Sequence, residues 1–147
     1  MPRKETDPII HQVMIEQNQG HETRKKLYFE LERVFDRPIV SFFTSFAFSV
    51  MIEDTDADML EGLIQKMDLS KGIVFFISSP GGDGLAAERI INVLRSYSGS
   101  SDYWVIVPGK AKSAATMVCF GSSKIIMGTT SELGPIDPQV TISIGDS

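Results

Sequence analysis

Apolar residues in this chain alternate between short continuous runs and helical spacing. Two runs, residues 73–77 (IVFFI) and 103–107 (YWVIV), are typical of strands covered on both faces of a parallel sheet. Segments 38–44 and 124–127 predict two further strands. The chain therefore contains several short buried strands separated by longer segments.

The segments between these strands have the spacing of amphipathic helices. Ser98 to Asp102 is a polar loop, and a short helix rich in small residues is expected over 113–120. Strands alternating with helices predict right-handed parallel crossovers and an α/β layer fold. The apolar positions that define the three longer helices are Leu27, Leu31, Val34 and Phe35; Met59, Leu60, Leu63, Ile64 and Met67; and Ala86, Ala87, Ile90, Ile91 and Leu94.

Charge is concentrated at the start of the chain. Residues 1–37 hold 7 of the 14 basic and 7 of the 19 acidic residues. We predict an N-terminal helical arm over 1–37 and a core domain over 38–147. The helix of the arm serves either as an outer or assembly helix, or as a solvated amphipathic helix packed on its own domain.

Composition narrows the class of protein. With 42% hydrophobic and 22% charged residues the chain is globular, and its net charge of −5 offers no basic footprint for nucleic acid. The apolar stretch 39–52 is too short for a transmembrane segment, although peripheral membrane association stays open. A single cysteine, Cys119, suits a reducing compartment, so a cytoplasmic location is expected. Two histidines and one cysteine without ligand spacing predict no metal, and no cofactor is expected.

One acidic cluster needs a separate explanation. Glu53, Asp54, Asp56 and Asp58 place four carboxylates within six residues. They could form a cation site, but the first turn of a helix favours negative charge, and this second interpretation is preferred.

Candidate chemistry lies in two strand-to-helix turns, which open at the same edge of a parallel sheet. The glycine turn (residues 79–84, SPGGDG) can bring backbone N–H groups close to a ligand, or can simply be a tight turn. The serine turn (residues 110–117, KAKSAATM) places Ser113 at the start of a helix, as a nucleophile or as an ordinary N-cap. Neither turn is specific by itself.

Together with their surroundings, the two turns resemble the serine dehydrogenase proteinase-like (SDH-type) family of the Clp/crotonase-fold serine peptidases. The likeness covers about residues 37–140, in several ordered blocks. These are FISSPGG (76–82), AAERI (86–90), LR (94–95), VIVP (105–108), AKSAATM (111–117), IIMG (125–128) and SELGPIDPQ (131–139).

The resemblance implies an α/β, Clp/crotonase-like layered fold with parallel ββα-type units. It implies a serine peptidase that forms an acyl-enzyme at Ser113, with the Gly82 and Ala114 amides as the oxyanion hole and Gly81, Asp83 and Asp137 in support. The implied substrate is a peptide or unfolded protein, and the relatives suggest a homo-oligomer. One departure is that Ala115 stands where family members usually have glycine.

A general base is missing from this pattern. The segment LGPIDP (133–138) has no histidine where Clp peptidases have theirs, and His11 and His21 lie in the arm. Lys112 adjoins Ser113, Lys124 is expected at the far end of the helix, and Lys110 is expected on the surface. The hypothesis that follows is that the chain is an incomplete domain, truncated at its C-terminus, whose base lies in missing residues or in a neighbouring subunit.

Two other functions remain open. The first is a catalytically inactive Clp-fold assembly or interaction module, which the missing base favours. The second is crotonase-type acyl-thioester chemistry, because that fold also uses paired backbone amides. The serine at the helix start favours the peptidase.

Overall fold

A computed structural model of the chain describes residues 8–18, 20–48 and 50–137. The chain divides into two compact units, 1–35 and 36–147, which are described separately. The predicted division at residue 37 stays a prediction. Residues 1–7 and 138–147, which include the last two positions of the SELGPIDPQ block, lie outside the described residues.

The first unit consists of two helices, α1 (Pro8–Gln17) and α2 (His21–Phe35). Pro8 occupies the first position of α1, where a missing N–H costs nothing. The helix predicted from the spacing of Leu27, Leu31, Val34 and Phe35 is confirmed as α2, whereas α1 was not predicted as a separate element. Within the described ranges, neither these helices nor those of the second unit are long and apolar enough to cross a membrane.

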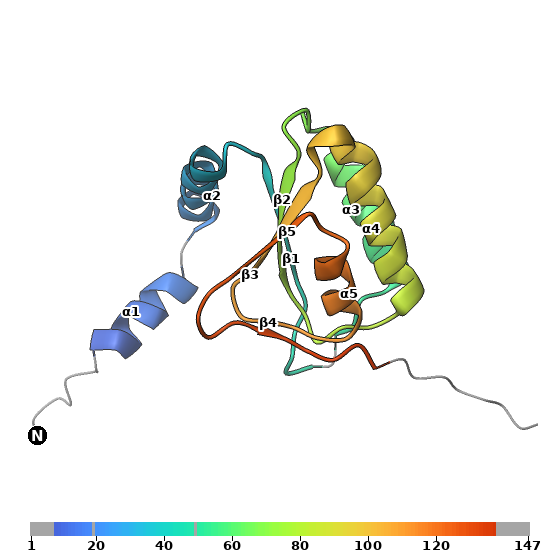
Figure 1. The fold of residues 1–147 in the computed structure, drawn as a ribbon. Helices are drawn as coiled ribbons and strands as arrows, with labels where there is room; N and C mark the ends of the chain where they lie inside the picture. Colours follow the sequence, from blue (N-terminus) through green and yellow to red (C-terminus); the bar gives the residue numbers. More distant parts are fainter. Residues whose placement is uncertain (1–7, 19, 49, 138–147) are drawn as a thin grey trace, which may run out of the picture. The chain divides into compact units, whose positions relative to one another are not determined.

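The second unit is built on a parallel four-stranded sheet with the order β1-β2-β3-β5 (Figure 1). Its strands are β1 (Ile39–Phe43), β2 (Ile73–Ser78), β3 (Tyr103–Val107) and β5 (Lys124–Met127). All four strands predicted from the sequence are therefore present, and the α/β class with a parallel sheet is confirmed. A second, two-stranded parallel sheet joins β4 (Lys110–Ala111) to β6 (Glu132–Leu133).

Helices connect the strands of the main sheet: α3 (Asp54–Ile64), α4 (Gly84–Ser98), which a short 3-10 helix (Gly99–Ser101) extends, and α5 (Ala114–Phe120). They lie together on one side of the sheet (Figure 1). The core between helices and sheet includes Val40, Leu60, Ile64, Phe75, Ile77, Ala87, Ile90, Leu94, Val105, Val107, Ala115 and Val118.

One predicted helix face is wrong in part. Met59 and Leu63 are 73% and 51% exposed, although their spacing placed them on the apolar face of α3. The helix buries a narrower face, formed by Ala57, Leu60 and Ile64, and ends before Met67. Ala57, Leu60 and Ile64 also follow helical spacing. Which side of α3 is buried therefore depends on the elements packed against it, and the spacing within α3 alone does not decide this.

The acidic cluster lies at the start of α3, as the helix interpretation predicts. The Glu53 amide donates to Asp56 Oδ2 at 2.8 Å, and Arg89 of α4 forms ion pairs with Asp54 and, at 2.6 Å, with Asp58. These carboxylates begin one helix and link it to the next. Among the described residues, no group of three or more potential ligands could hold a metal ion.

Tyr103 connects the sheet to α5. Its side chain is buried in the core, and its hydroxyl donates a 2.8 Å hydrogen bond to the Val118 carbonyl. Burial raises the pKa of the phenol well above its usual value, so the group stays a neutral donor. The bond thereby holds α5 against β3.

We expect Tyr103→Phe to lower the free energy of unfolding by about 1–2 kcal/mol, because the buried Val118 carbonyl loses a partner. Tyr97→Phe is the matched control, since the Tyr97 hydroxyl donates to Glu61 at the surface. Urea unfolding monitored by circular dichroism measures both. Equal stability of the two variants would contradict this role of Tyr103.

Candidate active site

The glycine turn and the serine turn meet. A Cβ added to Gly81 would lie 2.7 Å from Ser113 Cβ, 2.7 Å from the Lys112 carbonyl oxygen and 3.2 Å from the Ala114 nitrogen. Gly81 also has φ +108°, a conformation that other residues rarely adopt. The absence of a side chain at position 81 is therefore what allows its backbone to lie against Ser113.

Main-chain hydrogen bonds from Ser79 join the two turns. The Ser79 amide donates to the Lys110 carbonyl and the Lys112 amide donates to the Ser79 carbonyl, each at 3.0 Å. Ser79 thus pairs with Ala111 of β4 in a parallel bridge. The chain beyond β2 is held along the segment that leads to Ser113.

The loop after β1 fixes the other side of the glycine turn. The Ile52 amide donates to the Gly81 carbonyl at 2.8 Å, and the Asp83 amide donates to the Ile52 carbonyl at 2.9 Å. Because a trans peptide is planar, its N–H points opposite to its C=O. The Gly82 N–H, which shares a peptide with the Gly81 carbonyl, therefore points away from Ile52.

Two amides at this meeting point lack acceptors. Within the described ranges, neither the Gly82 N–H nor the Ala114 N–H donates a hydrogen bond to the protein. Ala114 is the first residue of α5, where an N–H has no partner within the helix, and Gly82 lies in a turn, so both groups are available to an external acceptor.

Ser113 itself has an unusual backbone conformation, with φ 49° and ψ −121°. A residue with a side chain adopts it only at a cost of about 1–3 kcal/mol, and such residues cluster at functional sites. Ser113 occupies the N-cap position of α5, but its side chain makes no capping hydrogen bond. The N-cap interpretation therefore does not explain why a hydroxyl is present here.

The start of α5 is packed tightly behind Ser113. Ala114, Ala115 and Thr116 are buried, and Thr116 Oγ1 donates to the Ala111 carbonyl at 2.8 Å. The methyl group of Ala115, the departure from the family pattern, is fully buried. These contacts hold the first turn of α5 on the core.

Residues 132–135 cover the serine turn from another direction. The Ser113 amide donates to the Pro135 carbonyl at 3.2 Å, and the Gly134 amide donates to the Ala111 carbonyl at 2.8 Å. Lys112 Nζ lies 2.8 Å from Glu132 Oε2, and this hydrogen bond, with the charge of Lys110, lowers the pKa of Glu132. The ammonium group nearest to Ser113 in sequence is thus paired with a carboxylate.

The remaining predicted site residues lie around this centre. Asp83 caps α4, since its Oδ1 accepts from the Leu85 and Ala86 amides at 2.7 and 3.3 Å. Asp137 is exposed, two residues after Pro135. The roles assigned to Ser113, Gly81, Gly82, Asp83, Ala114 and Asp137 by resemblance stay predictions.

Two of the lysines considered as bases have other partners in the second unit: Lys112 pairs with Glu132, as described above. Lys124 begins β5, where its Nζ lies 4.0 Å from the Trp104 ring centroid. In the part of the chain that the structure describes, no titratable side chain hydrogen-bonds to the Ser113 hydroxyl.

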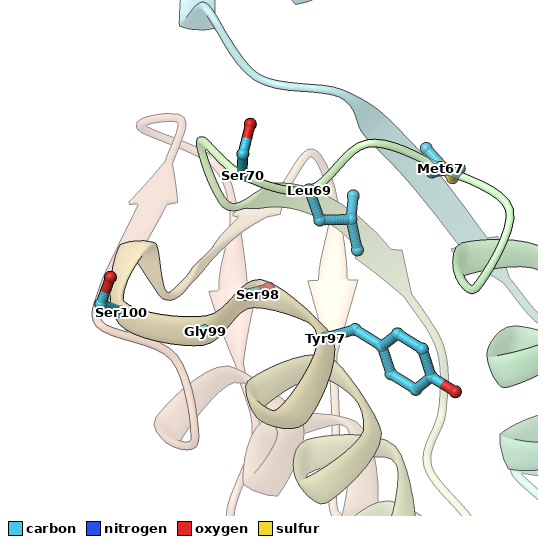
Figure 2. Close-up of a pocket in the computed structure, with 7 residues that line it drawn as sticks. All are labelled: Met67, Leu69, Ser70, Tyr97, Ser98, Gly99 and Ser100. Atoms are coloured by element: carbon cyan, nitrogen blue, oxygen red, sulfur yellow. The ribbon is translucent and has the colours of Figure 1, made fainter.

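A pocket of about 280 Å³ lies elsewhere (Figure 2). It is formed by the segment that precedes β2, the end of α4 and the 3-10 helix, whereas the glycine turn and the serine turn follow the carboxyl ends of strands. The pocket is therefore not part of the candidate site. Its lining consists of Met67, Leu69, Ser70, Tyr97, Ser98, Gly99 and Ser100.

We expect Gly81→Ala to lower the free energy of unfolding by about 2–4 kcal/mol, because the methyl group meets backbone at a strained φ. Gly62→Ala in α3 is the matched control: its Cβ would meet nothing within 4 Å, and alanine favours a helix by up to about 1 kcal/mol. Urea unfolding compares the two variants. A stable Gly81→Ala protein would show that the turns need not approach so closely.

Comparison with known proteins agrees with this geometry. Two uncharacterized proteins of Methanocaldococcus jannaschii are similar to the chain: one is 35% identical over 107 residues (73% of the chain and 34% of that protein), and the other is 29% identical over 91 residues (62% and 30%). The chain thus spans about a third of the length of these curated relatives. The model of the ClpP-like SDH-type serine proteinases matches residues 33–145, which include the glycine turn and the serine turn, and the chain belongs to this family.

Proposed function

We propose that this protein is a serine peptidase that hydrolyses peptide bonds through an acyl-enzyme at Ser113. The observation that carries the proposal is the meeting of Ser113 with the glycine turn, beside two amides for which the described residues provide no acceptor. Membership of a serine proteinase family supports the same reaction class. A peptide or an unfolded protein is the proposed substrate.

The reaction follows from these groups. Ser113 Oγ attacks the peptide carbonyl carbon while its proton passes to a base, and the carbonyl oxygen gains negative charge. The C–N bond then breaks and the amine leaves with the proton. A water molecule attacks the resulting ester, which releases the acid and restores the Ser113 hydroxyl.

The Gly82 and Ala114 amides are proposed to stabilise the oxyanion. Both are main-chain groups fixed by surrounding hydrogen bonds, so they need little reorganisation as charge develops. Loss of one such donor typically raises the barrier by about 3–4 kcal/mol. The unusual backbone conformation of Ser113 and the lack of a capping hydrogen bond from its side chain support a functional role for this residue.

The base is proposed to come from residues outside the described part of the chain, or from a second subunit. Lys112 is a poor candidate, since it is paired with Glu132 and adjoins Ser113 in sequence. The relatives are about three times as long as the matched region, so a longer protein has room for such a residue. Assembly into a homo-oligomer remains part of this proposal.

We expect a fluorophosphonate probe to label Ser113 in the full-length protein, identified by mass spectrometry of the labelled peptide. Ser113→Ala should abolish both labelling and cleavage of a peptide substrate. Ser122→Ala is the matched control, because its hydroxyl bonds main-chain carbonyls at the other end of α5.

Wild-type protein that is neither labelled nor active would overturn the peptidase. An assembly that persists unchanged in Ser113→Ala would then favour the interaction module, whereas binding of coenzyme A would favour acyl-thioester chemistry.

A further inference from the structure

A pair of hydroxyl groups lies beneath the glycine turn. Thr44 Oγ1 donates to Ser79 Oγ at 2.7 Å, and the Gly81 amide donates to the same Ser79 oxygen at 3.1 Å. Ser79 is completely buried. Thr44 is itself held by its amide, which donates to the Ser78 carbonyl at 3.0 Å. The three residues form a continuous chain of hydrogen bonds that ends at the glycine pair.

These bonds restrict the peptide that precedes Gly82. The Gly81 N–H donates a hydrogen bond to Ser79 Oγ, and the Gly81 carbonyl accepts one from the Ile52 amide. Rotation about the backbone of Gly81 is thereby blocked on both sides, although glycine alone would permit it. The direction of the Gly82 N–H is determined by the same contacts.

We propose that Thr44 and Ser79 are positioning residues for the oxyanion hole, which they serve by holding the Gly81–Gly82 peptide in its donating orientation. This inference rests on the proposed function, because it assigns a purpose to the direction of the Gly82 amide. Neither residue touches the substrate. Their effect passes through the backbone of Gly81.

Ser79 is placed to align both halves of the site. Its main chain pairs with β4, which leads to Ser113, while its side chain fixes the glycine turn. A change in its hydroxyl therefore alters the oxyanion donor without breaking the main-chain pairing that positions the nucleophile. The expected signature is a loss of transition-state stabilisation with substrate binding retained.

The experiment uses the full-length protein with three single substitutions. Ser79→Ala and Thr44→Val each remove a hydroxyl group, whereas Thr44→Ser keeps the hydroxyl group at position 44. Ser79→Ala should slow labelling of Ser113 by a fluorophosphonate about 10- to 100-fold. Ser79→Ala should lower kcat and the binding affinity for a peptide boronate inhibitor by the same factor, with KM nearly unchanged. Thr44→Val should act in the same direction to a smaller extent, and Thr44→Ser should return toward the wild-type rate.

Ser122→Ala controls for stability, since it removes a hydroxyl that bonds the Cys119 carbonyl far from the glycine turn. It should leave labelling unchanged. A wild-type labelling rate in both Ser79→Ala and Thr44→Val would overturn the positioning role. Parallel changes in KM and unfolding, without a selective loss of kcat, would also overturn it.

A second measurement separates this inference from the proposed function. Hydrogen exchange of the Gly81 amide, followed by NMR, reports its bond to Ser79 in protein that need not be active. Faster exchange in Ser79→Ala supports the proposed role of the Thr44 and Ser79 hydroxyl groups. This holds even if the wild-type protein is not labelled by the fluorophosphonate and the proposed peptidase activity is therefore rejected. Unchanged exchange would overturn the positioning role of Thr44 and Ser79. If the wild-type protein were still labelled at Ser113, the proposed peptidase activity would be unaffected by that result.

Discussion

The close approach of the Gly81 backbone to Ser113 is the contact on which the candidate site depends. It requires glycine, because a Cβ at position 81 would lie 2.7 Å from both Ser113 Cβ and the Lys112 carbonyl. It also requires the pairing of Ser79 with β4, which brings the turns after β2 and β3 side by side. A parallel sheet supplies the shared edge, and these two features convert that edge into a site.

Ser113 can occupy a strained conformation because its neighbours are held from several directions. Residues 110–113 bond to Ser79, to Gly134 and Pro135, and to the Thr116 hydroxyl. Net contributions of about 1 kcal/mol for each bond offset a strain of similar size at one residue. The segment 132–135 therefore belongs to the site through its backbone, although its glutamate only pairs with lysines at the surface.

The sequence predicts the elements that depend on local patterns of apolar residues. It does not predict features that depend on contacts between segments distant in the chain. Continuous apolar runs gave β2 and β3, and helical spacing gave α4. The meeting of the two turns followed from the rule for parallel strands. The strands β4 and β6 have two residues each and no pattern to detect. The exposure of Met59, the backbone strain of Ser113 and the hydroxyl pair of Thr44 and Ser79 arise from tertiary contacts.

The two parts of the proposed reaction make different demands on a fold. Oxyanion donors are main-chain amides, so two turns at one sheet edge can supply them within about a hundred residues. A general base is a side chain that must reach the serine from a further element, whereas the hydrogen bonds of residues 110–113 with Ser79, Gly134 and Pro135 are made by main-chain atoms. Under this proposal, a longer chain or a second subunit can supply the base without altering the proposed oxyanion hole. The proposed oxyanion donors and the proposed base can therefore come from different parts of the protein.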